Sequence, residues 1–176
     1  MPMTDDQLAA AMADASVLRG TFTLRSGKTS SYYLDKYRFV TRPDLLAELA
    51  KRFADRLPDG VDRIAGPELG GVPIATAVSL HTCIPTILVR NAKKDYGTAK
   101  QFEGVLEPGQ RVVITEDIAT TGGQSIEAAK LLRDECGADV AGIIVCIDRL
   151  EGARANVEDA GFAFDSLFTR QDLGID

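Results

Sequence analysis

One stretch decides the fold: residues 111–125 read Arg-Val-Val-Ile-Thr-Glu-Asp-Ile-Ala-Thr-Thr-Gly-Gly-Gln-Ser. The apolar run Val112–Ile114 predicts a buried strand, because short β-branched runs bounded by turn signals are typical of strands inside a sheet. A Thr- and Gly-rich turn follows, and residues 125–135 have the composition of a helix. A strand, a tight turn and a helix in that order form the repeating unit of α/β folds.

The same alternation continues on both sides of this stretch. Short apolar runs predict strands at residues 64–65, 86–89 and 143–147, and a further helix is predicted over residues 72–81. We therefore expect an α/β fold class, with a central parallel sheet and helices on both of its faces. Ligands of such sheets bind at the carboxyl ends of strands, so the residues that follow each strand carry the functional information.

The amino-terminal part of the chain has a different pattern. A helix is predicted from Asp5 to about Leu18, with Thr4 as its cap, and an amphipathic helix over residues 43–57. Residues 21–39 between them predict a short hairpin or irregular cover outside the core sheet. Because the chain has 176 residues and no repeat or linker, we expect one domain over 1–176, with a cover formed by 1–40 and a core formed by 41–176.

Composition excludes several classes of function. The formal net charge is −6, which argues against non-specific binding of nucleic acid. No apolar run approaches the roughly 20 residues of a membrane-spanning helix, and the acidic start is unlike a secretory signal. Three cysteines without a CxxC pair and a single histidine exclude a Cys/His zinc site. We therefore expect a cytoplasmic protein with no nucleic-acid or membrane partner.

The turn after the central strand is the first candidate site. Its backbone N–H groups, its hydroxyls and the following helix start suit a phosphomonoester. Glu116 and Asp117 would repel that phosphate, but they suit the hydroxyls of a sugar next to it, or a developing positive charge. The turn alone is explained equally well as a plain strand-to-helix connection; the two acids before it favour a phosphorylated ribose.

A basic segment is the second candidate site. Residues 88–104 carry a net charge of +2 in a chain whose remainder sums to −8. The segment is long, polar and bounded by glycine, which is typical of a loop that closes over a ligand, although a solvated loop has the same composition. Its basic residues could neutralise a pyrophosphate leaving group; they are Arg90, Lys93, Lys94 and Lys100.

The stretch at 111–125 resembles the phosphoribosyl pyrophosphate (PRPP) signature of the type I phosphoribosyltransferases, with its hydrophobic strand, two acids, two further residues and Thr-Thr-Gly-Gly. The resemblance implies the fold of that family, places Glu116 and Asp117 at the ribose hydroxyls and places the Thr120–Ser125 turn at the 5′-phosphate. The PRPP-binding residues that it implies are Arg90, Asn91, Lys94, Tyr96, Glu116, Asp117, Ile118, Ala119, Thr120, Thr121, Gly122, Gly123 and Gln124.

Three further segments are similar to the orotate-specific branch of that family. Residues 22–35 resemble its amino-terminal hood over the base, residues 94–97 its catalytic loop, and residues 146–152 its last core strand. We use the name hood for residues 1–40. The resemblance implies the catalytic residues Lys94, Asp117 and Glu116, and the orotate-binding residues Thr120, Arg149, Arg25 and Tyr33.

The charge of the two arginines agrees with this assignment. Orotate is an anionic pyrimidine, and Arg149 and Arg25 suit its carboxylate. Without the resemblance, an ion pair of Arg149 with Asp148 or Glu151 at the surface would be the preferred explanation.

The chain departs from the bacterial pattern of the family at several positions. Asn91 stands where a second Lys is common, Tyr96 where His is frequent, Leu69-Gly70 where a Tyr-Lys pair is found, and Gln124 where a small residue is frequent. The second departure removes an imidazole from the loop and leaves Lys94 or solvent to handle leaving-group charge.

The resemblance implies that PRPP and orotate react to give orotidine 5′-phosphate and pyrophosphate. Mg²⁺ is the expected cofactor, held near Glu116 and Asp117 through substrate and water rather than by direct protein ligands. A homodimer with shared active sites is expected. The alternatives are a phosphoribosyltransferase for another base and a regulator that senses PRPP without turnover.

Overall fold

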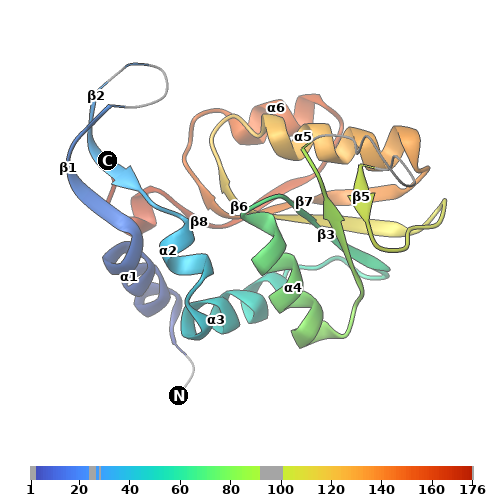
Figure 1. Ribbon diagram of the computed structural model, residues 1–176, viewed down its shortest axis with the longest axis horizontal. Helices are drawn as coiled ribbons and strands as arrows, with labels where there is room; N and C mark the ends of the chain where they lie inside the picture. Colours follow the sequence, from blue (N-terminus) through green and yellow to red (C-terminus); the bar gives the residue numbers. More distant parts are fainter. Residues whose placement is uncertain (1–2, 24–26, 28, 92–100, 176) are drawn as a thin grey trace.

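The computed structural model describes residues 3–23, 27, 29–91 and 101–175, and its centre is a six-stranded sheet (Figure 1). The strand order is β5-β4-β3-β6-β7-β8, and all neighbouring pairs are parallel except β4 with β5. The strands are β3 (Arg63–Pro67), β4 (Thr86–Val89), β5 (Phe102–Glu103), β6 (Arg111–Ala119), β7 (Asp139–Asp148) and β8 (Phe164–Thr169). The predicted parallel sheet is confirmed, and its central strand β6 is the one that decides the fold.

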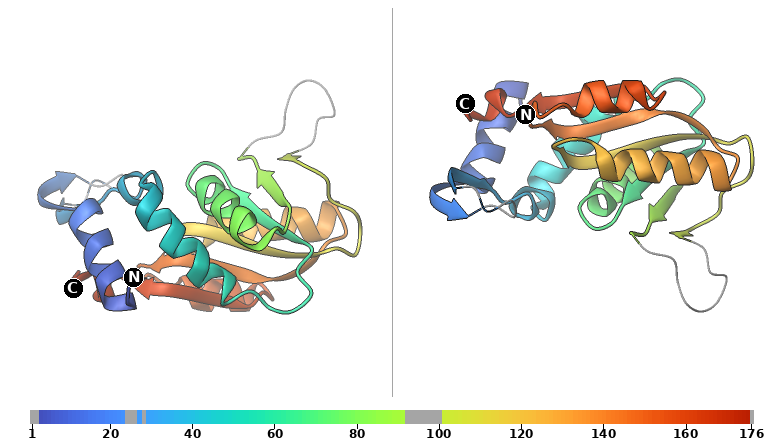
Figure 2. Two further views of the ribbon diagram at one scale, coloured as in Figure 1. Left: turned by 90° about the horizontal axis from the view of Figure 1, so that it is seen from below. Right: turned by 90° about the horizontal axis from the view of Figure 1, so that it is seen from above.

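Helices cover both faces of this sheet, as predicted (Figure 2). On one face lie α3 (Pro43–Ala54) and α4 (Gly71–Thr82); on the other lie α5 (Gly123–Lys130), its π-helical extension η1 (Leu131–Glu135) and α6 (Ala153–Asp159). Successive side chains of β6 pack alternately against the two helical layers, because neighbouring side chains of a strand point to opposite faces of the sheet. Val113 packs in the cluster with α3 and α4, whereas Val112 and Ile114 pack in the cluster with α5 and α6.

The hood is built from a helix, a hairpin and a short helix. These are α1 (Asp5–Ser16), β1 (Val17–Thr23), β2 (Thr29–Leu34) and α2 (Tyr37–Val40). The predicted hairpin is confirmed, since β1 and β2 form their own antiparallel sheet, separate from the core sheet. Thr4 caps α1 as predicted, through a capping box with Gln7.

Several predicted boundaries shift by a few residues. The first helix ends at Ser16 rather than Leu18, and the amphipathic helix ends at Ala54 rather than residue 57. The helix after the Thr/Gly turn begins at Gly123, two residues earlier than expected. The strand at 86–89 has the predicted bounds.

The hood and the core share one hydrophobic cluster. Leu8 and Met12 of α1 and Phe39 of α2 are fully buried together with Leu49 and Phe53 of α3. The 3₁₀ turn η2 (Gln171–Leu173) packs against α1 from the other end of the chain. This packing fixes the end of β2 next to the carboxyl end of β6, where the candidate site lies.

Candidate active site

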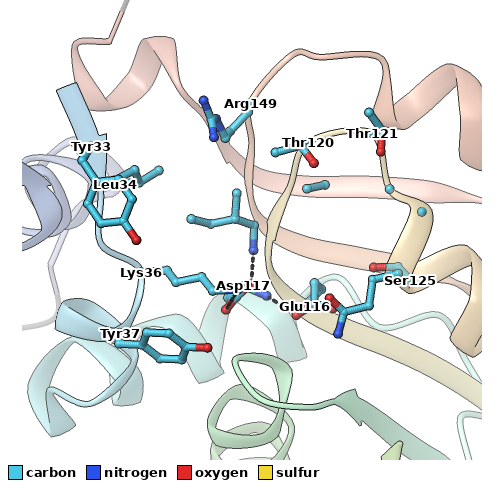
Figure 3. Close-up of a pocket in the computed structure, with 15 residues that line it drawn as sticks. Tyr33, Leu34, Lys36, Tyr37, Glu116, Asp117, Thr120, Thr121, Ser125 and Arg149 are labelled. Atoms are coloured by element: carbon cyan, nitrogen blue, oxygen red, sulfur yellow. Dashed lines mark hydrogen bonds and ion pairs between the residues drawn. The ribbon is translucent and has the colours of Figure 1, made fainter. Parts of the chain in front are cut away.

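A cavity of about 360 Å³ opens where β6 and β7 end and the hood begins (Figure 3). Its walls come from the segment after β2, from the end of β6, from the turn into α5 and from the residue after β7. The lining residues are Tyr33, Leu34, Lys36, Tyr37, Glu116, Asp117, Ile118, Ala119, Thr120, Thr121, Gly122, Gly123, Gln124, Ser125 and Arg149. The predicted sugar, phosphate and base residues that the structure describes therefore meet around one space, apart from Arg90 and Asn91.

The Thr/Gly turn has the geometry of an anion site. Gly122 has a φ of 76°, and a Cβ there would lie 3.0 Å from a Val157 methyl, so this position requires glycine. Asn156 Nδ2 donates to the Thr121 carbonyl at 2.8 Å and fixes the turn from outside. The first N–H groups of α5 have no acceptor within the helix, and they face the cavity edge with the positive end of the helix dipole.

The two acids lie at the end of β6 and are almost completely buried. Glu116 is 5% exposed and Asp117 is 1% exposed. The Asp117 N–H donates to Glu116 Oε1 at 3.1 Å, and the Ile118 N–H donates to Asp117 Oδ1 at 2.6 Å. Among the described residues, Glu116 Oε2 has no hydrogen-bond donor, and Asp117 Oδ2 has only the ammonium of Lys36 beside it, at 3.0 Å. Buried acceptors without donors are rare, and hydroxyl groups of a ligand would satisfy them.

Burial and the neighbouring charge act differently on the two acids. Desolvation, together with the charge of Asp117, raises the pKa of Glu116 well above its ordinary value. Asp117 faces the ammonium of Lys36, whose Nζ lies 3.0 Å from Oδ2 and 3.2 Å from Oδ1. Burial by itself lowers the pKa of Lys36, but attraction to Asp117 outweighs burial and leaves this pKa raised. The pair therefore has one acid whose pKa is raised by burial and one acid balanced by a cation.

Lys36 is a cavity residue that the sequence analysis missed, as are Leu34 and Tyr37. The only local signal is its place directly after the predicted hood-like segment 22–35. Its partner is 81 residues away in the chain, and pairing over that distance follows from the packing of the hood rather than from a local pattern.

Arg149 lines the cavity where the end of β7 meets the hood. Its N–H donates to the Ala119 carbonyl at 2.9 Å, so β6 and β7 are still joined where the cavity begins. Its Nη2 lies 3.3 Å from the Tyr32 hydroxyl and 2.9 Å from Glu151 Oε1. The surface ion pair weighed as the alternative thus forms with Glu151, while the Asp148 carboxylate accepts from the Leu150 N–H. Arg149 also lines the cavity, and its role toward the carboxylate of a base stays a prediction.

Arg90 and Asn91 lie beside this cavity rather than in it. They line a smaller hollow of about 30 Å³ next to Gln124, which borders both spaces. Gln124 Nε2 donates to the Glu68 carbonyl at 2.6 Å and to Asn91 Oδ1 at 3.1 Å, and the Asn91 N–H donates to Glu68 Oε1 at 2.6 Å. Two departures from the family pattern, Asn91 and Gln124, are therefore in direct contact and join three turns.

Several predicted residues lie outside the described residues. They are Arg25, Lys93, Lys94, Tyr96 and Lys100. Their roles remain predictions from the sequence.

The cavity was tested for a metal site. Among the residues that the structure describes, no group of three or more His, Cys, Asp or Glu side chains is placed to hold a metal ion. The carboxyl oxygens of Glu116 and Asp117 are the hard ligands that Mg²⁺ prefers, usually with retained water. The chemistry of the site therefore fits a hydrated Mg²⁺ that arrives with its substrate.

The comparisons with known proteins establish the family of the chain. A model of the phosphoribosyl transferase domain matches residues 42–168, so the chain belongs to the phosphoribosyltransferase family. Orotate phosphoribosyltransferase of Pyrococcus horikoshii is 46% identical over 98% of this chain and 94% of that protein, and the enzyme of Natronomonas pharaonis is 45% identical over 97% and 98%. Within the family the chain thus belongs to the orotate phosphoribosyltransferases.

A solved structure has the same architecture. Orotate phosphoribosyltransferase of Mycobacterium tuberculosis in complex with PRPP is 29% identical to this chain and superposes with a TM-score of 0.81. The match covers 97% of this chain and 99% of that one. Within the described part of the chain, no helix is long and apolar enough to cross a membrane.

Proposed function

We propose that the protein transfers the phosphoribosyl group of PRPP to orotate, giving orotidine 5′-phosphate and pyrophosphate. The observation that carries the proposal is one cavity that combines two buried acids, an anion-binding turn and an arginine wall. The acids suit the ribose hydroxyls, the turn suits the 5′-phosphate and Arg149 suits the carboxylate of the base.

In this reaction the bond between C1 of the ribose and the pyrophosphate oxygen breaks, and pyrophosphate leaves with the electron pair. The N1 atom of orotate forms the new bond to C1 after losing its proton to a base or to solvent. As the first bond lengthens, the ribose gains positive charge, which the Asp117 carboxylate stabilises from the cavity floor. The turn and Arg149 hold the two reactants in line, and this positioning lowers the barrier further.

Mg²⁺ belongs to the proposal as the partner of the donor. When bound, it neutralises charge on the pyrophosphate group, and Glu116 and Asp117 would orient the water that it retains. The basic residues of the 88–104 segment would add charge at the leaving group, with Lys94 foremost.

Three further expectations complete the proposal. The protein acts as a homodimer in which the 90–104 segment of one subunit serves the site of its neighbour. It works in the cytoplasm. Residues 1–176 form one domain, in which the hood closes the base side of the site and the core carries the donor side.

Two other functions make different predictions. A phosphoribosyltransferase for a purine has no use for an arginine at the base wall, because purines are neutral. A regulator that only senses PRPP would bind the donor without consuming it, and a net charge of −6 argues against nucleic-acid binding.

A phosphorus NMR experiment tests the reaction itself. Protein, Mg²⁺, PRPP and orotate are mixed, and we expect the donor signals to be replaced by equal amounts of pyrophosphate and a nucleotide monophosphate. Omitting orotate should stop the conversion. Binding of the donor without conversion would assign the regulator function, and conversion that ignores orotate would exclude orotate as the acceptor.

A further inference from the structure

The ammonium of Lys36 lies against the acid that the proposed chemistry needs most. Its Nζ donates to Asp117 Oδ1, and the Ile118 N–H donates to the same oxygen. The same ammonium lies 3.0 Å from Oδ2, so Lys36 spans both oxygens of the carboxylate.

The backbone around Lys36 is held in place by the core. The Lys36 carbonyl accepts from the N–H groups of Phe39 and Val40, both buried, and the Asp35 N–H donates to the Ser16 carbonyl at 2.9 Å. The side chain is 34% exposed and lines the cavity, and its Nζ lies 5.5 Å from the centre of the Tyr37 ring (Figure 3). An exposed lysine on a weakly held turn would have many rotamers. The backbone of Lys36 is held by these hydrogen bonds, and its ammonium pairs with a buried carboxylate.

The opposite side of the carboxylate is occupied by the backbone of Gly70. A Cβ at this position would lie 1.5 Å from Asp117 Oδ2 and 2.4 Å from Cγ. Its backbone is in the ordinary helical region, so the nearest obstacle to an alanine there is the Asp117 side chain. Both residues therefore define the position of the Asp117 carboxylate: Lys36 attracts it by charge, and Gly70 leaves the space that it occupies.

We propose that Lys36 is a positioning residue of the transfer reaction, which holds the Asp117 carboxylate in the place where it receives the ribose hydroxyls. This inference rests on the proposed function, because the hydroxyls come from the donor. Lys36 also cancels one negative charge beside a site that binds polyanions, so its loss should weaken binding of the donor more than binding of orotate.

The test is a double-variant cycle on donor binding. The affinity for PRPP with Mg²⁺ is measured by calorimetry for wild type, Lys36→Met, Asp117→Asn and the double variant. We expect Lys36→Met to weaken binding at least about tenfold, as for the loss of a charged hydrogen bond, and to add less than about twofold in the Asp117→Asn background. Lys36→Arg, which keeps the charge, should recover most of the affinity. Lys51→Met is the matched control, because Lys51 pairs with Glu48 at 2.6 Å on the surface of α3.

Each other outcome contradicts the inference. Equal losses in both backgrounds would mean that Lys36 touches the donor itself, and tighter binding would mean that it competes with the donor. Unchanged binding would leave Lys36 with no role in the site. If Lys36→Met does not fold, Gly70→Ala replaces it: displacement of the carboxylate should weaken donor binding at least about tenfold, and unchanged affinity would overturn the inference. Wild-type turnover of orotate, measured in parallel, separates failure of this inference from failure of the proposed function.

Discussion

At the scale of single residues, two adjacent carboxylates on one strand have different surroundings. Asp117 is paired with a lysine, whereas Glu116 has a raised pKa because it is buried next to another acid. The strand thus presents to the same cavity one carboxylate paired with a cation and one carboxyl group whose pKa is raised by burial. Such a division suits a site that must accept sugar hydroxyls without repelling a polyanion.

The Asp117→Asn variant tests the role of the acid that pairs with Lys36. The amide keeps the size of the side chain and an acceptor for the Ile118 N–H, so we expect the melting temperature to stay close to that of wild type. We expect kcat/KM to fall by about 100-fold or more, because the charge acts on the transition state. Asp165→Asn is the control, since Asp165 pairs with Arg56 on the surface. Unchanged kcat/KM would remove Asp117 from the mechanism, and a large loss of melting temperature would make its role structural.

The Glu116→Gln variant tests the raised pKa of Glu116 through the free energy of unfolding, measured by urea titration. A raised pKa in the folded state means that Glu116 favours folding below its unfolded pKa, which is about 4.3, and that this contribution is lost as pH rises through the folded pKa. The free energy of unfolding of wild type, relative to Glu116→Gln, should therefore decrease from pH 4 towards pH 8.

For Glu48→Gln, the free energy of unfolding of wild type relative to the variant should show the opposite dependence on pH, again measured by urea titration. Hydrogen bonds from Lys51 and Arg52 lower the pKa of Glu48, so its contribution appears as pH rises above the unfolded value and is lost in acid. A Glu116→Gln difference that is flat with pH, or that follows the Glu48→Gln trend, would contradict the raised pKa.

Sequence patterns identify residues whose chemistry is local. Glu116, Asp117 and the Thr120–Gln124 turn are adjacent in the chain, so their pattern alone predicted that they act together. Lys36 was missed because its position depends on a contact between the hood and β6. Arg90 lines the smaller hollow next to Gln124, and its predicted role at the donor stays a prediction.

At the scale of elements, the site depends on turns that hold one another. Gln124 at the start of α5 reaches the turn after β3 at Glu68 and the end of β4 at Asn91. Parallel strands end at the same edge of a sheet, so neighbouring turns can share hydrogen bonds across it. These hydrogen bonds hold the three turns on the donor side of the site in fixed positions relative to one another.

A cycle of Asn91→Ala, Gln124→Ala and the double variant tests this hydrogen-bond network. Each single variant should raise the KM for PRPP by about threefold to tenfold, and the double variant should be little worse than either, because both remove the same contact. Gln110→Ala is the control, since Gln110 accepts from the Glu107 N–H in a distant turn. Fully additive effects in initial-rate measurements would show that the two side chains act independently.

Elements with strong periodicity were predicted and weak ones were not. The strand at 86–89 and helix α4 have continuous apolar patterns, and both were found. Strand β8 buries Phe164, Leu167 and Phe168, a spacing without period two, and helix α6 has only seven residues with two of them buried. Their structure depends on pairing with β7 and packing under α5, which no local pattern reveals.

At the scale of the whole molecule, the hood is tied to the core by shared packing. Leu8 and Met12 lie in the same hydrophobic cluster as Leu49, so the base side and the donor side of the cavity form one unit. The proposed dimer adds a second level, in which the 90–104 segment of each subunit completes the site of the other.

Mixing two inactive variants tests that exchange. Lys94→Ala damages only the loop and Asp117→Asn damages only the sugar site, so a mixed dimer would hold one intact site and one doubly damaged site. Random exchange makes half of the dimers mixed, and about a quarter of all sites should regain activity through the two-fold symmetry. Each variant alone should stay near zero. If mass measurements show exchange and the mixture stays inactive, each loop serves its own subunit.

The central claim is that the cavity under the hood joins orotate, rather than another base, to PRPP. The most direct measurement follows the loss of orotate absorbance with Mg²⁺ and PRPP, beside matched assays with uracil, adenine and hypoxanthine. We predict that kcat/KM for orotate exceeds that for each other base by about 100-fold or more, because a base without the carboxylate leaves Arg149 unmatched. Equal turnover of a purine or of uracil, or binding of PRPP with no loss of orotate, would contradict the account.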